Sequence, residues 1–311
     1  MKVLVVGAGS IGKRHYGNLT ELGAEATLRP WRGYGLAGFE AEVAEYDAVV
    51  IATATEIRLG LIEAAVAAGK PLYIEKPLAA DLAEVEAIAA ICPPVAERSM
   101  LGYMMRYHPA FRALAREDRS EVFQFSLSIG HDVTQWRANW KFSESYAARP
   151  EGGGVLLDLC HELDMAHCLF PDINVEDVQC HGHAAYPQVD MASRISLRGA
   201  RVSGEVCMDY LTPRLHRRAI LRGISRSFDF DFAAQRYLLS DLAAERQIDL
   251  PLERNQMFLS ITKDFLALAA GKAPSDVEHL PRLDLALDSA RLAAQAREAR
   301  RFIATIAKEI P

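Results

Sequence analysis

The chain has 311 residues, a formal net charge of -6 at pH 7 and an apolar fraction of 50%. This length suffices for two domains of ordinary size, and the lack of a basic excess argues against a nucleic-acid partner. No apolar stretch reaches the roughly 20 residues of a membrane span, and the first residues read as a strand rather than a signal peptide. We therefore expect a cytoplasmic protein without membrane contact.

A glycine-rich turn lies between the first expected strand and the first expected helix. Residues 2–6 form an apolar run, residues 13–22 have a helical pattern, and Gly7, Gly9 and Gly12 lie between them. In a dinucleotide-binding turn the first glycine permits the tight turn, the second lets the backbone approach the phosphates, and the third lets the helix pack on the strand. The order of strand, glycine turn and helix predicts a nucleotide site at the helix N-terminus.

Strands and helices alternate along the first part of the chain. Apolar runs typical of buried strands occur at residues 24–28, 48–53, 71–74 and 98–103, and helical patterns occur at 57–68 and 81–91. This alternation predicts a parallel sheet that helices cover on both faces. We expect an α/β Rossmann domain, with a doubly wound parallel sheet, over residues 1–118.

The pattern changes near residue 120, where apolar and polar residues begin to alternate. Such alternation, typical of strands with one buried face, occurs at residues 123–129, 202–210 and 228–232, with helical patterns at 155–170, 254–270 and 283–307. We expect an α+β domain over residues 119–311 with an open, mostly antiparallel sheet. Its second face is either polar and open or covered by a second subunit.

The five cysteines predict neither a disulfide framework nor a metal site. Their number is odd and their spacing is irregular. Cys180, His181 and His183 are metal-ligand types in one short segment, but a tetrahedral site needs further ligands at suitable spacing. A strand with alternating side chains explains this segment, and we expect no bound metal.

Glu75, Lys76 and Pro77 directly follow an expected parallel strand. Ligands of open α/β sheets bind at the carboxyl ends of the strands, which makes Lys76 a candidate to bind a substrate hydroxyl and move its proton. Pro77 favours an extended conformation at Lys76 and stiffens the turn. The alternative is that Lys76 is a solvated loop residue, as most lysines are.

A second polar group follows the three glycines at positions 152–154. On one continuous helix Asp158, His161 and Glu162 would share a face, and Asp158 could orient His161 and raise its basicity as a general base. The alternative is that Asp158 caps the helix and that His161 is a satisfied polar residue at a domain seam.

Together these motifs resemble the Gfo/Idh/MocA family, which includes glucose–fructose oxidoreductase and inositol dehydrogenase. The resemblance is carried by residues 7–15, 52–55, 68–70, 75–78, 102–109 and 152–164. It implies an NAD(P)-dependent dehydrogenase or reductase that acts on CH–OH groups of a sugar, cyclitol or sugar derivative. It also implies an N-terminal Rossmann domain and a C-terminal sheet through which a homo-dimer or homo-tetramer forms.

The resemblance also assigns roles to individual positions. It implies catalytic roles in proton transfer and substrate orientation for Lys76, Asp158 and His161. The cofactor-binding positions that it implies are Gly7, Gly9, Ser10, Ile11, Gly12, Thr53, Glu75 and Lys76. The chain departs from the usual family spacing because Glu162, and not His161, stands four residues after Asp158. This departure leaves open whether His161 or Glu162 is the acid/base.

Other departures support an alternative function. Arg58 stands where the family commonly has His, Ala54 where it has Pro, and Met104 where it has Asn. These changes motivate a non-catalytic NAD(P)-binding sensor or partner subunit. The intact Glu75–Pro77 motif and the Asp158/His161 pair speak against that alternative, and we expect an enzyme.

The end of the second expected strand bears on the choice of cofactor. A site that prefers NAD(H) usually has Asp or Glu there to bind the ribose 2′-hydroxyl, whereas this chain has Arg29, with Arg32 close behind. A guanidinium suits the 2′-phosphate of NADP(H). We expect NADP(H) to be preferred; the alternative is that both arginines are solvated and that NAD(H) binds as well.

A set of aromatic and polar residues could line a pocket for a polyol. Aromatic faces suit the C–H surfaces of sugars, and arginine suits a carboxylate, but Tyr and Trp are also common packing residues. The substrate-binding candidates are Tyr103, Arg106, His108, Trp136, Arg137, Tyr146 and Glu162.

Overall fold

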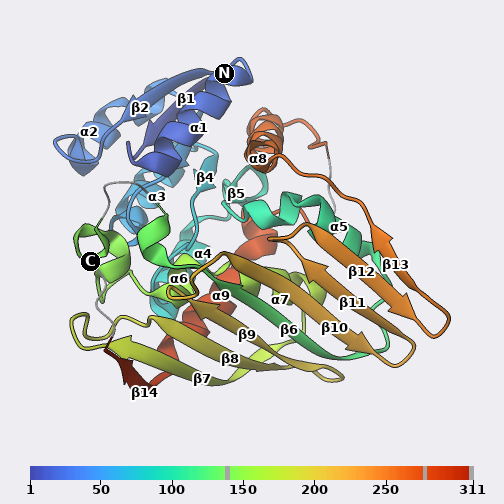
Figure 1. Ribbon diagram of the computed structural model, residues 1–311. Coiled ribbons are helices and arrows are strands. Elements are labelled where there is room, and N and C mark those ends of the chain that lie inside the picture. The colour runs from blue at the N-terminus through green and yellow to red at the C-terminus, as the bar shows by residue number, and fades with distance from the viewer. Residues whose placement is uncertain (137–140, 276–278, 308–311) are drawn as a thin grey trace. The chain divides into compact units, whose positions relative to one another are not determined.

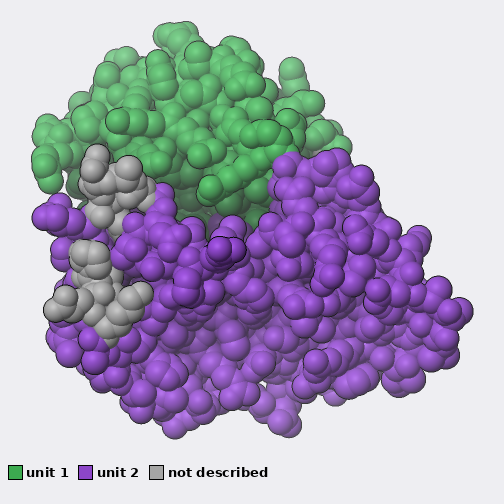
Figure 2. Space-filling view, in the orientation of Figure 1, with its two compact units in different colours: residues 1–107, 253–291 green, residues 108–252, 292–311 purple. Residues whose placement is uncertain are grey.

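The computed structural model describes residues 1–136, 141–275 and 279–307, and it divides into two compact units. Unit 1 comprises residues 1–107 and 253–291, and unit 2 comprises residues 108–252 and 292–311 (Figure 2). The sequence predicts one boundary, between residues 118 and 119, whereas this division changes units after residue 107 and assigns residues 253–291 to unit 1. A helix of residues 253–291 packs on the helix that follows the glycine turn.

Among the described residues, five parallel strands form the sheet of unit 1 (Figure 1). Their order is β2-β1-β3-β4-β5, and their bounds are β1 (Lys2–Val6), β2 (Glu25–Arg29), β3 (Ala48–Ile51), β4 (Leu72–Ile74) and β5 (Met100–Leu101). Val6 pairs with both Arg29 and Ile51, so the carboxyl ends of the first three strands lie at one edge of the sheet. The central strands are buried along nearly their whole length, as an apolar run in a parallel sheet predicts.

Helices cover both faces of this sheet. They are α1 (Ser10–Glu21), α2 (Gly35–Glu42), α3 (Arg58–Ala67), α4 (Leu82–Ile91) and α8 (Arg254–Ala269), while α9 (Leu283–Glu298) begins in unit 1 and ends in unit 2. The chain passes from β1 to β2 on one side of β1, and it then crosses back over β1 to β3 on the other side. Because such crossovers are right-handed, α1 lies on one face with α8, and α2, α3 and α4 lie on the other. The doubly wound α/β domain is confirmed.

In the described part of unit 2, nine strands form one sheet in the order β13-β12-β11-β10-β6-β9-β8-β7-β14 (Figure 1). Their bounds are β6 (Val122–Gly130), β7 (Asn174–His183), β8 (Ala192–Arg198), β9 (Ser203–Asp209), β10 (His216–Gly223), β11 (Arg226–Asp231), β12 (Arg236–Asp241), β13 (Glu245–Ile248) and β14 (Arg300–Ile306). The neighbouring strands are antiparallel except for β6 with β9 and β7 with β14. The mostly antiparallel sheet is therefore confirmed.

One face of this sheet carries the core of unit 2. Phe125, Leu127 and Val206 are buried there, and the short helices α5 (Pro109–Arg116), α6 (Val155–Asp158) and α7 (His161–Leu169) supply the covering layer. Residues that alternate with the buried ones, such as Gln124 and Glu205, are more exposed on the opposite face. Because apolar and polar residues alternate along each strand, one face of the sheet is apolar, and α6 and α7 pack on that face.

Two of the expected helices are wrong in their extent. The segment 155–170 is two helices, because α6 ends at Asp158 and α7 begins at His161. The helix expected over 283–307 ends at Glu298, and the residues after it form β14, which pairs with β7. The last segment contains Phe302, Ile303 and Ile306, residue types that fit a strand once a pairing partner is available.

Candidate functional site

The glycine turn between β1 and α1 contains glycines of two kinds. Gly7 has a φ of 110°, and a Cβ built on it would lie 2.3 Å from the carbonyl oxygen of Ala52. A Cβ on Gly12 would lie 1.7 Å from the carbonyl oxygen of Gly7. A Cβ on Gly9 would meet no described atom within 4 Å. The fold itself thus requires Gly7 and Gly12, whereas a side chain at position 9 would extend into open space beside the start of α1.

The start of α1 is arranged to receive an anion. Gly9 precedes the helix in an extended conformation, and in the described chain no side chain caps this helix start and no acidic residue lies in its first turn. Ser10 is exposed and Ile11 is half-buried. The free backbone N–H groups and the helix dipole both favour a phosphate at this point.

Thr53 and Glu75 follow the carboxyl ends of β3 and β4. The Thr53 side chain is buried, and its hydroxyl has no hydrogen-bond partner among the described residues. The Glu75 carboxylate is held on both oxygens: Oε1 lies 2.7 Å from Nε2 of the buried His15, and Oε2 accepts a bond from the Lys76 backbone N–H at 3.2 Å. His15 therefore orients Glu75, and Lys76 follows it half-buried.

Arg58, at the first position of α3, holds the backbone on both sides of Lys76. It is buried, and its guanidinium donates to the carbonyl oxygens of Thr53, Glu75 and Pro77. Two of these carbonyls lie on either side of Lys76. A planar guanidinium with five donors suits such convergent acceptors, and these hydrogen bonds fix the backbone from which Lys76 projects.

These features fit a nicotinamide dinucleotide. The open Cβ position at Gly9 and the uncapped start of α1 suit a pyrophosphate. The unsatisfied hydroxyl of Thr53 is a buried polar atom that a bound molecule would satisfy. Thr53, Glu75 and Lys76 lie at the carboxyl end of the parallel sheet, where ligands of such sheets bind.

Arg29 is already engaged in an ion pair within unit 1. Its Nε donates to Oε1 of Glu42 at 2.9 Å and its Nη2 to Oε2 at 3.0 Å, while the Tyr34 hydroxyl donates to Oε1 at 2.5 Å. The hydrogen bonds from Arg29 lower the pKa of Glu42, so this carboxylate is ionised at neutral pH. Arg32 is exposed. Sequence reasoning missed Glu42, which partly neutralises the guanidinium expected to bind a 2′-phosphate.

In unit 2, Asp158 lies between two tyrosine hydroxyls. Tyr146 donates to Oδ1 at 2.6 Å and Tyr210 donates to Oδ2 at 3.1 Å. Asp158 is 6% exposed, whereas Tyr146 is 42% exposed. Burial raises the pKa of Tyr210 well above its usual value, so Tyr210 remains a donor. Trp136 packs edge-to-face on the Tyr210 ring, with the centroids 5.5 Å apart.

The break between α6 and α7 changes the expected relation of Asp158 and His161. Because these residues lie on different helices, they do not share a face through helical spacing. His161 is buried at the start of α7. Positions 159 and 160 are Leu and Cys, so no Gly or Pro marks the break in the sequence.

Glu162 is fully buried and paired with a residue from a distant strand. Arg217 of β10 donates from Nε to Oε1 at 2.5 Å and from Nη2 to Oε2 at 3.1 Å. The side chain of Glu162 is 0% exposed and that of Arg217 is 16% exposed. A buried carboxylate in a bidentate pair is suited to joining α7 to the sheet rather than to exchanging protons.

His108, expected to contact substrate, caps helix α5. It is buried, its Nδ1 accepts a hydrogen bond from the Ala110 backbone N–H at 3.1 Å, and its ring packs edge-to-face on Phe232. Burial, with a smaller contribution from the charge of Arg217, lowers the pKa of His108 from 6.5 to about 4. The imidazole is therefore neutral and acts as an N-cap acceptor.

This neutral cap predicts a pH dependence of stability. Between pH 6.5 and about 4 the unfolded chain binds a proton at position 108 that the folded chain does not. The free energy of unfolding should therefore fall as the pH falls through this window, by about 3 kcal/mol. The His108→Asn variant keeps a capping acceptor and removes this titration. Urea unfolding at several pH values measures the difference, and equal losses in both proteins would contradict a neutral His108.

The other expected pocket residues are distributed over both units. In unit 1, Tyr103 and Arg106 are buried, and Arg106 donates to the Leu280 carbonyl and to the hydroxyl of Ser289. In unit 2, Trp136 and Tyr146 join the cluster around Asp158. Arg137 lies outside the described residues. Tyr103 and Arg106 thus have packing roles within unit 1, while Trp136 and Tyr146 belong to a polar cluster.

Neither a metal centre nor a membrane helix is found in the described parts of the chain. Within residues 1–136, 141–275 and 279–307, no group of three or more His, Cys, Asp or Glu residues could hold a metal. Cys180 is a buried residue of β7, with its Sγ 3.2 Å from Oγ of Ser193. Within the same ranges, no helix has the length and apolar character needed to cross a membrane.

Comparisons with known proteins agree with the fold. Residues 36–103 match the family model described as an oxidoreductase family with an NAD-binding Rossmann fold. An inositol 2-dehydrogenase of Rhizobium meliloti (strain 1021) is 34% identical over 187 residues, which is 53% of this chain and 53% of that protein. The chain thus aligns with about half the length of this relative.

Solved structures of low sequence identity share the fold. A 3-ketoreductase from Actinomadura kijaniata, solved with NADP and TDP-benzene, has a TM-score of 0.78 and 19% identity, covering 98% of this chain and 99% of that one. A levoglucosan dehydrogenase solved with NADH and levoglucosan has a TM-score of 0.77 and 17% identity, covering 96% and 98%. The matching family model and the inositol 2-dehydrogenase relative support the resemblance of the chain to the Gfo/Idh/MocA family of oxidoreductases.

Proposed function

We propose that the protein is an NAD(P)-dependent oxidoreductase that transfers a hydride between the nicotinamide and a carbinol or carbonyl carbon of a sugar, cyclitol or sugar derivative. The observation that carries the proposal is the glycine at position 9. The protein's own packing leaves that position open, next to an uncapped helix start that suits a phosphate. The bound cofactor would accept or deliver the hydride.

Unit 1 would hold the cofactor. In this proposal Gly7, Gly9, Ser10, Ile11 and Gly12 form the phosphate-binding turn. Thr53 and Glu75 would lie beside the nicotinamide half, which gives the unsatisfied Thr53 hydroxyl a partner.

Lys76 would bind the reacting hydroxyl of the substrate and exchange its proton. The support is positional: Lys76 is half-buried after β4, and both backbone carbonyls that flank it are fixed by Arg58. An ammonium with three rotatable donors can follow an oxygen that changes from alcohol to ketone. Glu75, held by His15, would keep this turn in one conformation.

Unit 2 would orient the substrate. We assign the acid/base role to His161 rather than Glu162, because both carboxylate oxygens of Glu162 are held by Arg217 in a fully buried pair. Asp158 would act through its hydrogen bond to Tyr146, whose exposed ring and hydroxyl suit a polyol. Trp136 would add an aromatic surface to the same cluster.

The substrate class is inferred from chemistry and from relatives. The proteins named above are an inositol 2-dehydrogenase and, among the structures, a 3-ketoreductase and a levoglucosan dehydrogenase. A panel of cyclitols, sugars, sugar nucleotides and their keto forms, assayed with both cofactors, tests the proposal. Reduction or oxidation of one panel member at a CH–OH carbon is expected, and cofactor binding without turnover of any member would favour a sensor.

We further propose that NADP(H) is preferred over NAD(H), on the basis of Arg29 and the exposed Arg32. Glu42 opposes this preference because its carboxylate already accepts hydrogen bonds from Nε and Nη2 of Arg29. The Glu42→Gln variant should therefore shift the ratio of the two dissociation constants toward NADPH by roughly tenfold, since removing one nearby charge is worth about 1 kcal/mol or somewhat more.

The control for this prediction is Glu45→Gln, which removes one negative charge from an exposed position three residues away. Fluorescence titration with NADPH and NADH measures both constants. Tighter NADH binding by the wild type would contradict the NADP(H) preference. An equal shift in the Glu45→Gln variant would contradict the specific role of Glu42.

We also propose a homo-dimer or homo-tetramer formed through the uncovered face of the unit 2 sheet. That face carries ion pairs between neighbouring strands, such as Arg194 with Glu205 and Arg218 with Asp229. The oligomer and a cytoplasmic location both stay predictions.

A further inference from the structure

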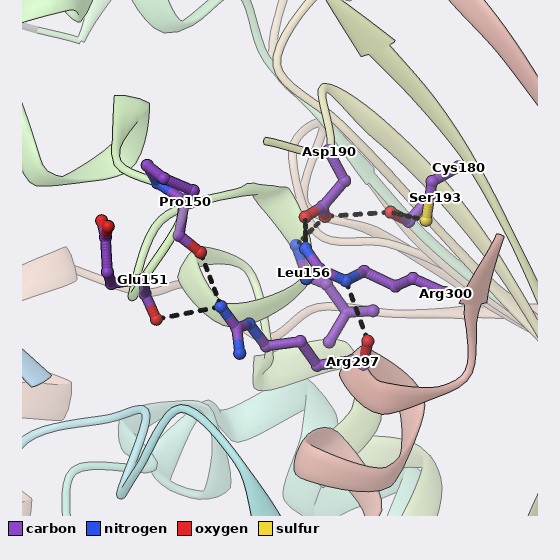
Figure 3. Close-up of polar contacts among 8 residues, drawn as sticks. All are labelled: Pro150, Glu151, Leu156, Cys180, Asp190, Ser193, Arg297 and Arg300. Carbon is purple, nitrogen blue, oxygen red and sulfur yellow. Dashed lines mark hydrogen bonds and ion pairs between the residues drawn. The ribbon is translucent and has the colours of Figure 1, made fainter. Parts of the chain in front are cut away.

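Asp190, which lies between β7 and β8, holds the start of helix α6 from 34 residues away in the chain. Its backbone oxygen accepts the Val155 N–H at 2.9 Å. Its Oδ2 accepts the Leu156 N–H at 2.9 Å (Figure 3). In the described chain, Gly154 precedes α6 without a capping side chain of its own. Asp190 therefore performs the capping that helix starts normally obtain from the residue just before them.

The glycines before α6 are required by this arrangement. Gly154 has a φ of 94°, and a Cβ there would lie 2.2 Å from Oδ1 of Asp190. A Cβ on Gly153 would lie 2.4 Å from the Ala147 carbonyl oxygen and 2.6 Å from that of Tyr146. The glycine run thus joins two elements closely: the turn that carries Tyr146 and the cap formed by Asp190.

Arg300, the first residue of β14, compensates the buried charge of Asp190. Its Nη1 donates to Oδ1 at 2.7 Å, and the two side chains are 12% and 1% exposed. Arg300 is itself anchored, because its Nε donates to the Arg297 carbonyl at 2.8 Å. The Arg297 Nη2 donates in turn to the carbonyl oxygens of Pro150 and Glu151 at 2.7 and 2.9 Å (Figure 3). The C-terminal segment therefore contacts both the cap and the residues that lead into the glycine run.

We propose that the Arg300–Asp190 pair is a positioning device that holds Asp158 against Tyr146. This inference rests on the proposed function, in which the Asp158 cluster orients the substrate. Helix α6 has four residues and ends at Asp158, so a shift at its start moves the carboxylate directly. So short a helix has little stability of its own and depends on contacts from outside.

The same strand offers a matched comparison for the pair. Arg301 follows Arg300 and pairs with Asp177, but these side chains are 62% and 34% exposed and lie at the sheet surface. Removing an exposed ion pair has little effect, whereas removing Arg300 leaves a buried carboxylate without its charge partner. Effects specific to Arg300 and Asp190 therefore report on the buried pair and not on the charge of the strand.

The first test uses hydrogen exchange on the full chain and needs no substrate. In Arg300→Met and Asp190→Asn, amides of residues 153–159 should exchange about tenfold faster than in the wild type, because local opening becomes easier. In Arg301→Met and Asp177→Asn these amides should be unchanged. Arg300→Lys keeps the charge and should give an intermediate rate of exchange. This variant takes the place of Arg300→Met in the test if Arg300→Met does not fold. Unchanged exchange in the folded Arg300 variants, or equal acceleration in the Arg301 variant, would overturn the proposal.

The second test uses whichever substrate the wild type turns over. Arg300→Met should reduce kcat by roughly 10²-fold, as expected when a group at a reaction site is displaced, while the dissociation constant of the cofactor stays the same. Arg300→Lys should restore part of kcat, and Arg301→Met should resemble the wild type. Faster exchange without any loss of kcat would overturn the link to catalysis. If the wild type turns over nothing, the proposed function fails, and the exchange experiment alone decides the structural role of the pair.

Discussion

Replacing Lys76 by methionine is expected to lower kcat by roughly 10²- to 10⁴-fold, the range typical of losing a group that transfers a proton. Methionine has nearly the length of lysine but no ammonium, so it removes the proton carrier while filling similar space. Because the glycine turn, and not this side chain, is proposed to bind the pyrophosphate, the dissociation constant of the cofactor should change much less than kcat. Stopped-flow or steady-state measurement of nicotinamide absorbance gives kcat, and fluorescence gives the binding constant.

The chain contains a matched control for this substitution. Lys70 also precedes a proline and also flanks β4, but it lies before the strand, where its Nζ donates to the Ala44 carbonyl at 2.9 Å. Lys70→Met should have the kcat of the wild type. A Lys76→Met variant with undiminished kcat on the true substrate would refute the proton-transfer role, as would an equal loss in Lys70→Met.

The second large effect is expected within the glycine turn, where substitution of one glycine should weaken cofactor binding and substitution of another should lower the stability of the fold. Gly9→Val should fold as well as the wild type, because position 9 is extended and nothing described lies within 4 Å of its Cβ. Its affinity for NADPH and NADH should fall roughly 10²-fold, since blocking the turn removes one or two charge-assisted hydrogen bonds of about 1.5–3 kcal/mol each. Calorimetry measures the binding, and urea unfolding measures the stability.

Gly12→Ala should behave in the opposite sense. Its Cβ would lie 1.7 Å from a backbone oxygen, so the free energy of unfolding should fall by about 2 kcal/mol or more. Gly17→Ala, in the open middle of α1, is the control and should gain about 1 kcal/mol of stability without any change in binding. Full cofactor affinity in Gly9→Val would remove the main support for a nucleotide at this turn.

Local patterns were sufficient to predict the parallel sheet of unit 1 and the helices between its strands. The glycine turn, the apolar runs and the alternation of strands and helices are all features of short segments, and they predict a parallel sheet with its ligand edge. They do not show that α8, more than 150 residues later, packs on α1 and belongs to the same unit. Such a contact depends on tertiary packing, which leaves no local signal.

Unit 2 shows where sequence patterns fail. Arg300 to Ile306 follows a long helical pattern and was expected to continue it, but pairing with β7 makes it a strand. The break between Asp158 and His161 has no local marker. Tertiary contacts decide both outcomes, and local propensity is too weak to oppose them.

The candidate site likewise contains residues that local motifs indicate and residues that they do not. Motifs were sufficient to propose Gly7, Gly9, Gly12 and Lys76 as candidates, since the proposed chemistry of each depends on the strand or turn that carries it. The partners that fix the site could not be found, because they come from distant segments. These partners are His15 and Arg58 for Glu75–Pro77, Glu42 for Arg29, Arg217 for Glu162, Tyr210 for Asp158, and Asp190 with Arg300 for helix α6.

Transfer of deuterium from the nicotinamide to the substrate would demonstrate the proposed hydride transfer. Cofactor carrying deuterium at the transferable position of the reduced ring is incubated with the protein and a keto-sugar that it turns over, and the product is analysed by mass spectrometry and NMR. We expect one deuterium on the new carbinol carbon of each product molecule. An unlabelled product formed while the nicotinamide is oxidised would contradict hydride transfer between cofactor and sugar carbon.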